Sequence, residues 1–310
     1  MGRAYEYAWI NALYNELSNK RVTSIVDNSS LEANKRAWDS IDKVMRETFK
    51  LSAISAVDKI LELEPRMSEN CNGKLILELQ SDKAGEQGDV RDIVIKRNDI
   101  DWEIGLSIKH NHEAIKHSRL SHRLDFGKQW FDVPCSREYW KDIEPIFNKL
   151  KIDKENKTKW AEIVNKEDNV YVPLLEAFIK EIKTAYASDS SIPRKMIEYL
   201  IGKDDFYKIV SVDKDRMTLI HTFNIHGDLN KPSQNKVSQI FVPILKLPTE
   251  LIEIRFKPDC KNTLEMYLNN GWQLSFRIHN ASTYVEPSLK FDIKFVGMPV
   301  EILTIECYWK

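Results

Sequence analysis

Residues 89–123 read DVRDIVIKRNDIDWEIGLSIKHNHEAIKHSRLSHR, and this stretch decides the expected fold. Asp92 opens a short apolar run, a polar turn follows at 98–101, and a second run extends from Trp102 to Lys109. Apolar runs of this length on either side of turn residues are typical of a β-hairpin. The hairpin brings Asp92, at the start of the first strand, beside Lys109, at the end of the second.

A carboxylate beside an ammonium at the exposed end of a hairpin suits the cleavage of a phosphate ester. The carboxylate is a ligand for a divalent cation, and the lysine can steer or deprotonate the attacking water and stabilise developing charge. Asp92 and Lys109 are therefore the leading catalytic candidates, with Asp92 as a metal ligand. The alternative is a surface ion pair between a turn aspartate and a strand-end lysine.

The second acid of such a site is missing from its usual position, two residues before the lysine. That position holds Ser107, and an uncharged hydroxyl cannot replace a carboxylate as a charged magnesium ligand. Glu103 points to the same side as Ser107 and Lys109, but it lies four residues back, about 13 Å along an ideal strand. A bulge at Gly105 would shorten that distance.

Two further acids come from neighbouring segments. Glu113 begins the segment after the strand and can turn back toward its end. Glu6 leads the apolar face of a helix expected from Ala4 to about Leu17. It reaches the edge of the site if that face packs on the sheet, and it is otherwise a solvated acid of the first helical turn. We rank Glu6 first as the missing ligand and treat Glu103 and Glu113 as comparable alternatives.

The segment 112–124 returns to helical spacing, with His112, Lys116, Arg119 and Arg123 at offsets of 0, 4, 7 and 11 residues. This spacing predicts one basic stripe, placed either to touch a phosphate backbone or simply to face solvent. The letters HNH at 110–112 do not indicate an HNH nuclease, because that motif is spread over a ββα-metal fold. His112 remains a candidate for contacting the scissile phosphate, or is a polar residue at the helix start.

The composition is that of an ordinary soluble globular protein, with 42% apolar and 30% charged residues in a chain of 310. No apolar run is long enough to cross a membrane, and Glu6 and Glu16 interrupt the N-terminal apolar stretch of a would-be signal peptide. The four cysteines form no CxxC pair, so neither a zinc site nor a disulfide framework is indicated. These features favour a reduced, cytoplasmic enzyme. A net charge of −1 argues against a surface that is basic throughout, but it is compatible with local basic patches.

The chain changes character along its length. Helices are expected over 29–65 and over most of 137–186, with a strand at 74–79 between them. A polar linker follows at 188–191, and repeated short alternations over 205–310 indicate strands and hairpins.

The fold class expected from this pattern is α/β (α+β), in two consecutive parts. An α/β nuclease core is expected over residues 1–186, followed by a β-rich recognition region over residues 187–310.

With these residues in view, the chain resembles the HaeIII-type family of type II restriction endonucleases, within the PD-(D/E)xK superfamily. The stretches that carry the resemblance are GRAYEYA, GDVRDIVI, EIGLSIKHNHEAIKHSRLSHRLDFG, DFYK, FNIHG and SFRIHNASTYVEPSLKFD. They span nearly the whole chain, and the two longest are far more specific than the catalytic triplet.

The resemblance implies a magnesium-dependent endonuclease, with manganese as a substitute, that cuts duplex DNA at a short GC-rich palindrome such as GGCC. It also implies a companion DNA methyltransferase that protects the host. The first superfamily acid maps to Asp92 and the lysine to Lys109, with Ser107 where the second acid usually stands. That departure leaves the ligand set open.

Reading of GC pairs most naturally uses arginine or lysine forks against guanine. Arg277, with His279 and Asn280 beside it, is the leading base-reading candidate; otherwise it is a structural arginine that pairs with Asp292 or Glu286. A palindromic site favours a homodimer, although a monomer also suffices.

Two rival functions remain at this stage. One is a structure-specific or repair nuclease on the same core, and the other is a catalytically inactive DNA-binding protein, which Ser107 makes conceivable.

Overall fold

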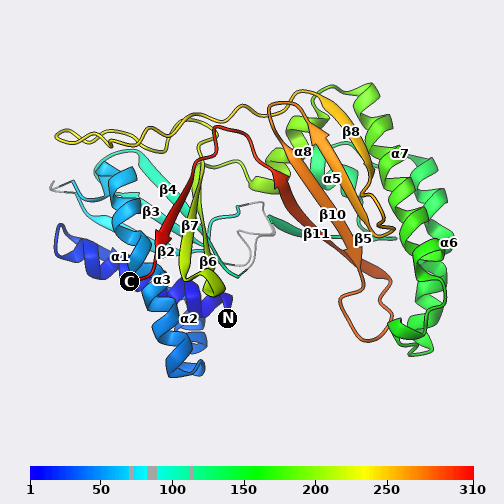
Figure 1. Ribbon diagram of the computed structural model, residues 1–310, viewed down its shortest axis with the longest axis horizontal. Coiled ribbons are helices and arrows are strands. Elements are labelled where there is room, and N and C mark those ends of the chain that lie inside the picture. Colours follow the sequence, from blue (N-terminus) through cyan, green and yellow to red (C-terminus); the bar gives the residue numbers. More distant parts are fainter. Residues whose placement is uncertain (70–72, 82–88, 112–114) are drawn as a thin grey trace. The chain divides into compact units, whose positions relative to one another are not determined.

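The computed structural model describes residues 1–69, 73–81, 89–111 and 115–310. The chain forms two compact units, and neither is continuous in sequence (Figure 1). Unit 1 comprises Met1–Glu113, Gly202–Lys246 and Val300–Lys310, and unit 2 comprises Ala114–Ile201 and Leu247–Pro299. The two consecutive parts expected from the sequence, divided after residue 186, thus differ from these interleaved units.

Unit 1 is built on a mixed seven-stranded sheet of order β1-β2-β3-β4-β6-β7-β12. Its strands are β1 (Thr23–Ile25), β2 (Leu75–Leu79), β3 (Ile93–Arg97), β4 (Trp102–His110), β6 (Phe206–Val212), β7 (Met217–Phe223) and β12 (Thr304–Tyr308). The pairs β1–β2 and β4–β6 are parallel, and the other neighbours are antiparallel. The expected hairpin is confirmed as β3 and β4, and the strand expected over 74–79 as β2.

The described residues of unit 1 form the helices α1 (Gly2–Ser18), α2 (Ser29–Ser40) and α3 (Lys43–Leu63), followed by the short 3-10 turn η1 (Pro65–Met67). The helix expected near the N-terminus is confirmed as α1. The single helix expected over 29–65 is wrong, because the chain divides it after Ser40. Asp42 begins the second part: its side chain accepts a hydrogen bond from Met45 N at 2.8 Å and caps α3.

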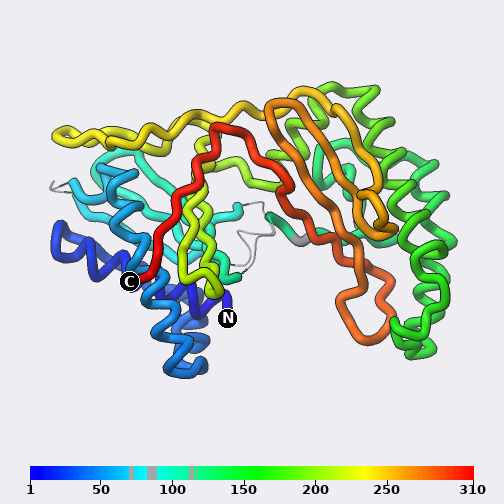
Figure 2. Tube along the Cα trace, in the orientation of Figure 1, coloured from blue at the N-terminus to red at the C-terminus, as the bar shows by residue number. Residues whose placement is uncertain are grey.

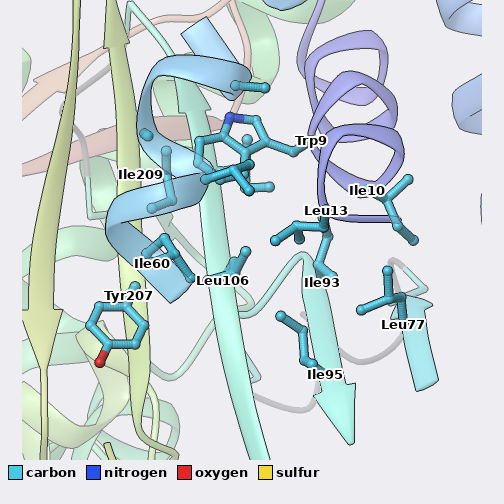
Figure 3. Close-up of a cluster of buried hydrophobic side chains, with 14 of the residues drawn as sticks. Trp9, Ile10, Leu13, Ile60, Leu77, Ile93, Ile95, Leu106, Tyr207 and Ile209 are labelled. Carbon is cyan, nitrogen blue, oxygen red and sulfur yellow. The ribbon is translucent and has the colours of Figure 1, made fainter. Parts of the chain in front are cut away.

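The core of unit 1 lies between the sheet and the helices α1 and α3. Figure 3 shows Trp9 and Leu13 of α1 beside Ile93 of β3 and Leu106 of β4. Side chains of a strand alternate between its two faces, and the core takes every second residue of β4 from Trp102 to Ile108. Glu103, Ser107 and Lys109 therefore lie on the opposite face of the sheet.

Unit 2 contains an antiparallel five-stranded sheet of order β5-β11-β10-β9-β8. The strands are β5 (Lys116–Ser121), β8 (Leu251–Phe256), β9 (Thr263–Leu268), β10 (Gln273–His279) and β11 (Ser288–Gly297). Four helices accompany them: α5 (Phe126–Phe131), α6 (Arg137–Glu155), α7 (Val172–Ser188) and α8 (Ile192–Ile201). Short turns of helix lie at η2 (Trp160–Glu162) and η3 (Glu167–Tyr171). The strands expected in the C-terminal alternations are confirmed as β10 and β11.

The core of unit 2 is aromatic. Trp130 of α5 and Phe178 of α7 pack on Phe276 of β10 and Phe291 of β11, with ring centroids 5.1–6.3 Å apart. The helix expected over 112–124 is wrong, because residues 116–121 form strand β5 and pair with β11. His112 and Glu113 lie outside the described residues.

Residues 224–246, which follow β7, contain neither helix nor strand. Figure 2 shows residues 231–246 as an extended trace. Asp205 fixes the start of the segment by accepting hydrogen bonds from the backbone N–H groups of Ile225, His226 and Asp228. No helix among the described residues is long and apolar enough to cross a membrane.

Candidate active site

Asp92 and Lys109 meet at the end of the hairpin, as the sequence predicted. Lys109 Nζ donates a hydrogen bond to Asp92 Oδ2 at 2.9 Å, and Ile108 N donates to the same oxygen at 2.5 Å. The Ser107 hydroxyl is 3.4 Å from it. The main chain of Asp92 is held by the sheet on both sides, through its N–H to Leu106 O and its C=O to Gln80 N. The carboxylate is thus fixed, and Oδ1 takes part in none of these side-chain bonds.

Helix α1 brings Glu6 to the same place. Burial and, second, the negative charge of Asp92 raise the pKa of Glu6 to about 7, against smaller opposing effects of Asn34 and Lys109. Glu6 and Asp92 line the same cavity. Glu6 Oε2 accepts a hydrogen bond from Asn34 Nδ2 at 2.8 Å. The sequence analysis ranked Glu6 first as the missing acid, and the structure places Glu6 and Asp92 in the lining of one cavity.

A cavity of about 750 Å³ opens beside the two carboxylates. Its lining includes Glu6, Asn34, Asp89, Arg91 and Asp92, all from unit 1. Among the described residues, no three side chains of the His, Cys, Asp or Glu type gather as a complete ligand set. Two carboxylates nevertheless fit magnesium, which commonly keeps several waters and takes its other ligands from substrate phosphates.

Glu103 is committed to a different partner. Its Oε1 accepts a hydrogen bond from Arg91 Nη1 at 2.7 Å, and Arg91 also binds both carboxylate oxygens of Asp89. The register of β3 and β4 runs without a shift past Gly105, so the bulge considered above is absent there. A Cβ at Gly105 would lie 2.0 Å from Arg91 Cδ, so glycine lets the arginine cross the strand.

A polar row crosses the middle of this sheet face. In the strand register Ser107 lies beside Lys208, Lys208 beside His221, and His221 beside Thr304, which continues the row that starts at Asp92. Lys208 is only 7% exposed. Burial and, second, the charge of Lys208 lower the pKa of His221 to about 4, so this imidazole is neutral at pH 7.

Sequence reasoning missed Lys208 and His221. Lys208 belongs to the DFYK stretch that carries the family resemblance, and that was the available signal.

Three members of the predicted basic stripe, Lys116, Arg119 and Arg123, do not form one helical face, because they belong to strand β5 and to the turn after it; His112 lies outside the described residues. Lys116 faces the core of unit 2, with Nζ 3.8 Å from the centre of the Tyr199 ring and bound to Tyr199 O at 2.8 Å. Burial lowers the pKa of Lys116 to about 8. Arg119 and Arg123 are exposed, and Arg119 Nη1 donates to Ser288 O at 3.1 Å.

The three recognition candidates in unit 2 differ in their surroundings. Arg277 is exposed on β10 and, among the described residues, forms no ion pair. Glu286, considered above as its partner, is 2.9 Å from Lys154 instead. His279 Nδ1 lies 3.5 Å from Asp292 Oδ2.

Asn280 serves the loop that follows it: its amide donates to Ser282 O and Tyr284 O and accepts from Glu286 N. Of the three candidates, Arg277 is the one whose side chain is available to a ligand.

Comparison with known proteins gives two matches. The family model described as HaeIII restriction endonuclease matches residues 2–299. The type II restriction enzyme HaeIII of Haemophilus aegyptius is 51% identical over 310 residues, which cover 100% of this chain and 97% of that protein. No solved structure matches the chain.

Proposed function

The chain belongs to the HaeIII restriction endonuclease family, and we propose that the end of the β3–β4 hairpin in unit 1 is its active site. The protein is a type II restriction enzyme, a site-specific deoxyribonuclease. The observation that carries the site assignment is the Lys109–Asp92 contact of 2.9 Å with Glu6 in the same cavity. Asp92 at the entry of one strand and Lys109 near the end of the next also support a PD-(D/E)xK core.

Asp92 and Glu6 would hold the magnesium ion, for which manganese would substitute. When bound, the cation would supply positive charge that stabilises the charge developing on the phosphate. Lys109 orients the attacking water and adds a second positive charge at the reacting phosphate. Ser107 acts through Asp92: its hydroxyl, 3.4 Å from Oδ2, helps to hold the carboxylate in place. Glu6 thereby replaces the acid that is absent at position 107.

The substrate is duplex DNA, and the recognition site is the GC-rich palindrome GGCC, proposed from the 51% identity to HaeIII. Unit 2 supplies the base reading. The exposed Arg277 is free to form a bidentate contact with guanine, while Arg119 and Arg123 contact phosphates. A companion methyltransferase, a cytoplasmic location and a homodimer that matches the palindrome complete the proposal.

Digestion of unmethylated bacteriophage DNA with magnesium and with chelator tests this function, followed by sequencing of the fragment ends. Discrete fragments that share GGCC-derived ends, formed only with the metal, are the expected result. Cutting at branches or lesions without a common end sequence would favour a structure-specific nuclease. Binding to DNA without cleavage in magnesium or manganese would indicate an inactive DNA-binding protein.

A further inference from the structure

Most residues of helix α2 are polar, and Asn34 is the one residue of this helix that is buried, 3% exposed. A side-chain amide at such a position requires hydrogen-bond partners, because an unpaired buried polar group is costly. Asn34 Nδ2 donates to Glu6 Oε2 at 2.8 Å, and both residues line the cavity beside Asp92. The amide is therefore directed at the acid that the proposed function assigns to the metal.

The position of α2 is fixed relative to the catalytic hairpin. Asn28 caps the helix through Leu31 N at 2.9 Å, and its amide also donates to Leu79 O at the end of β2 at 3.1 Å. Gln80, which follows Leu79, donates its backbone N–H to Asp92 O at 2.9 Å. A short chain of bonds thus connects the base of α2 to Asp92, so Asn34 and Asp92 are held on a common frame.

We propose that Asn34 is a positioning residue of the cleavage reaction, which holds the Glu6 carboxylate in place through Oε2 so that Glu6 can bind the cation together with Asp92. A neutral amide suits this task. It favours the ionised carboxylate, as any donor does, but unlike lysine or arginine it adds no positive charge that would repel the cation. This inference rests on the proposed role of Glu6 as a metal ligand.

The competing explanation is purely structural: the bond satisfies a buried amide and helps α1 to pack on α2. The two explanations separate in a double-mutant cycle of Asn34→Leu and Glu6→Gln, because a residue that acts only through Glu6 has no further effect once Glu6 is changed. Asn34→Ala, which favours a helix, is the second variant if leucine destabilises the fold. Asn11→Leu is the matched control, since Asn11 donates to Tyr7 O at 2.7 Å on the same helix as Glu6.

The cycle is read in two ways: the magnesium concentration that gives half-maximal cleavage of a GGCC duplex, and Mn²⁺ binding to the free enzyme by electron paramagnetic resonance. Partners that orient a metal ligand typically change metal affinity roughly 10–100-fold when they are removed. Asn34→Leu is expected to raise the half-maximal magnesium concentration and to weaken Mn²⁺ binding, each by about that factor. Asn34→Leu should have a much smaller effect on the cleavage rate at saturating magnesium. Asn11→Leu should leave the half-maximal magnesium concentration and the Mn²⁺ affinity unchanged.

In the Glu6→Gln background, Asn34→Leu is expected to have no further effect on Mn²⁺ binding. Equal effects in both backgrounds, or a loss of cleavage at unchanged Mn²⁺ affinity, would overturn the positioning role. Glu6→Gln with wild-type Mn²⁺ binding and magnesium requirement would instead overturn the proposed assignment of Glu6. The two failures are therefore distinguishable.

Discussion

The two sheets of this protein carry their polar side chains in different ways. On the first sheet, the face opposite α1 and α3 bears Lys109 and Asp92 in direct contact, with three donors directed at one carboxylate oxygen. On the second sheet, the side chains that alternate with the aromatic core include several exposed or half-buried cations. They are Arg119, Arg255, Arg277, Lys290 and Lys294.

This difference teaches what each surface is suited to do. A group that acts on a transition state must be held in position before the substrate arrives. A group that reads a base must instead keep its donors available for the DNA, and the side chain of Arg277 is exposed. The comparison therefore predicts that changes on the first sheet affect the rate of cleavage, and changes on the second affect which DNA is bound.

Lys109→Ala is the change with the largest expected effect on cleavage. Loss of a group that assists proton transfer and stabilises charge typically lowers the rate by about 10²–10⁴-fold. Binding to the cognate duplex, measured by fluorescence anisotropy with chelator present, should remain close to wild type. Equal loss of binding and cleavage would contradict the catalytic assignment and erase the contrast between the sheets.

Arg277→Ala tests the other side of the comparison. Loss of a bidentate contact with guanine should weaken binding to a GGCC duplex by about 1–3 kcal/mol and leave binding to an unrelated duplex nearly unchanged. Competition titrations at fixed salt measure both affinities. His279→Ala, a change at the neighbouring candidate, serves as a comparison variant. A parallel fall of the two affinities in Arg277→Ala would indicate that Arg277 contacts a phosphate instead of a base.

The pH dependence of cleavage sharpens the assignment of Glu6. Its pKa is raised to about 7, so the carboxyl is protonated below that pH and cannot bind a cation. At low magnesium, the single-turnover rate should fall about tenfold per pH unit below 7, because one proton must be lost. Saturating magnesium should move the midpoint to lower pH, since the cation competes with the proton. A pH midpoint that does not change with the magnesium concentration would contradict the assignment of Glu6 as a metal ligand.

The smallest predicted effect concerns the polar row on the first sheet. The charge of Lys208 helps to lower the pKa of His221, although burial is the larger cause. Lys208→Met should therefore raise the His221 pKa from about 4 toward its ordinary value while leaving the imidazole neutral at pH 7. An NMR titration of the ring protons measures this, and an unchanged pKa would show that the two side chains do not interact.

Local patterns were enough to predict the elements that carry their own signals. The alternating apolar residues of β4, β10 and β11 and the helical face of α1 follow from sequence periodicity. Strand β5 was missed because its core-facing side includes Lys116, whose charge lies over the Tyr199 ring instead of in solvent. A lysine in that position gives no apolar alternation, and the basic residues happened to match helical spacing.

The remaining features depend on contacts between distant parts of the chain. Strands β4 and β6 are neighbours although the whole first segment of unit 2 lies between them in sequence. For this reason neither the interleaved units nor the place of Lys208 beside Ser107 follows from local pattern. Asn34 is likewise an ordinary polar residue of a polar helix until its contact with Glu6 is seen.

The central claim is that Asp92 and Glu6 form the metal site of unit 1, and Asp92→Asn tests it most directly. Asparagine keeps the size of the side chain and removes its charge, so Mn²⁺ binding by electron paramagnetic resonance and cleavage of a GGCC duplex should be lost together. Binding to the same duplex in chelator should persist. Mn²⁺ binding at wild-type affinity in Asp92→Asn would contradict the account.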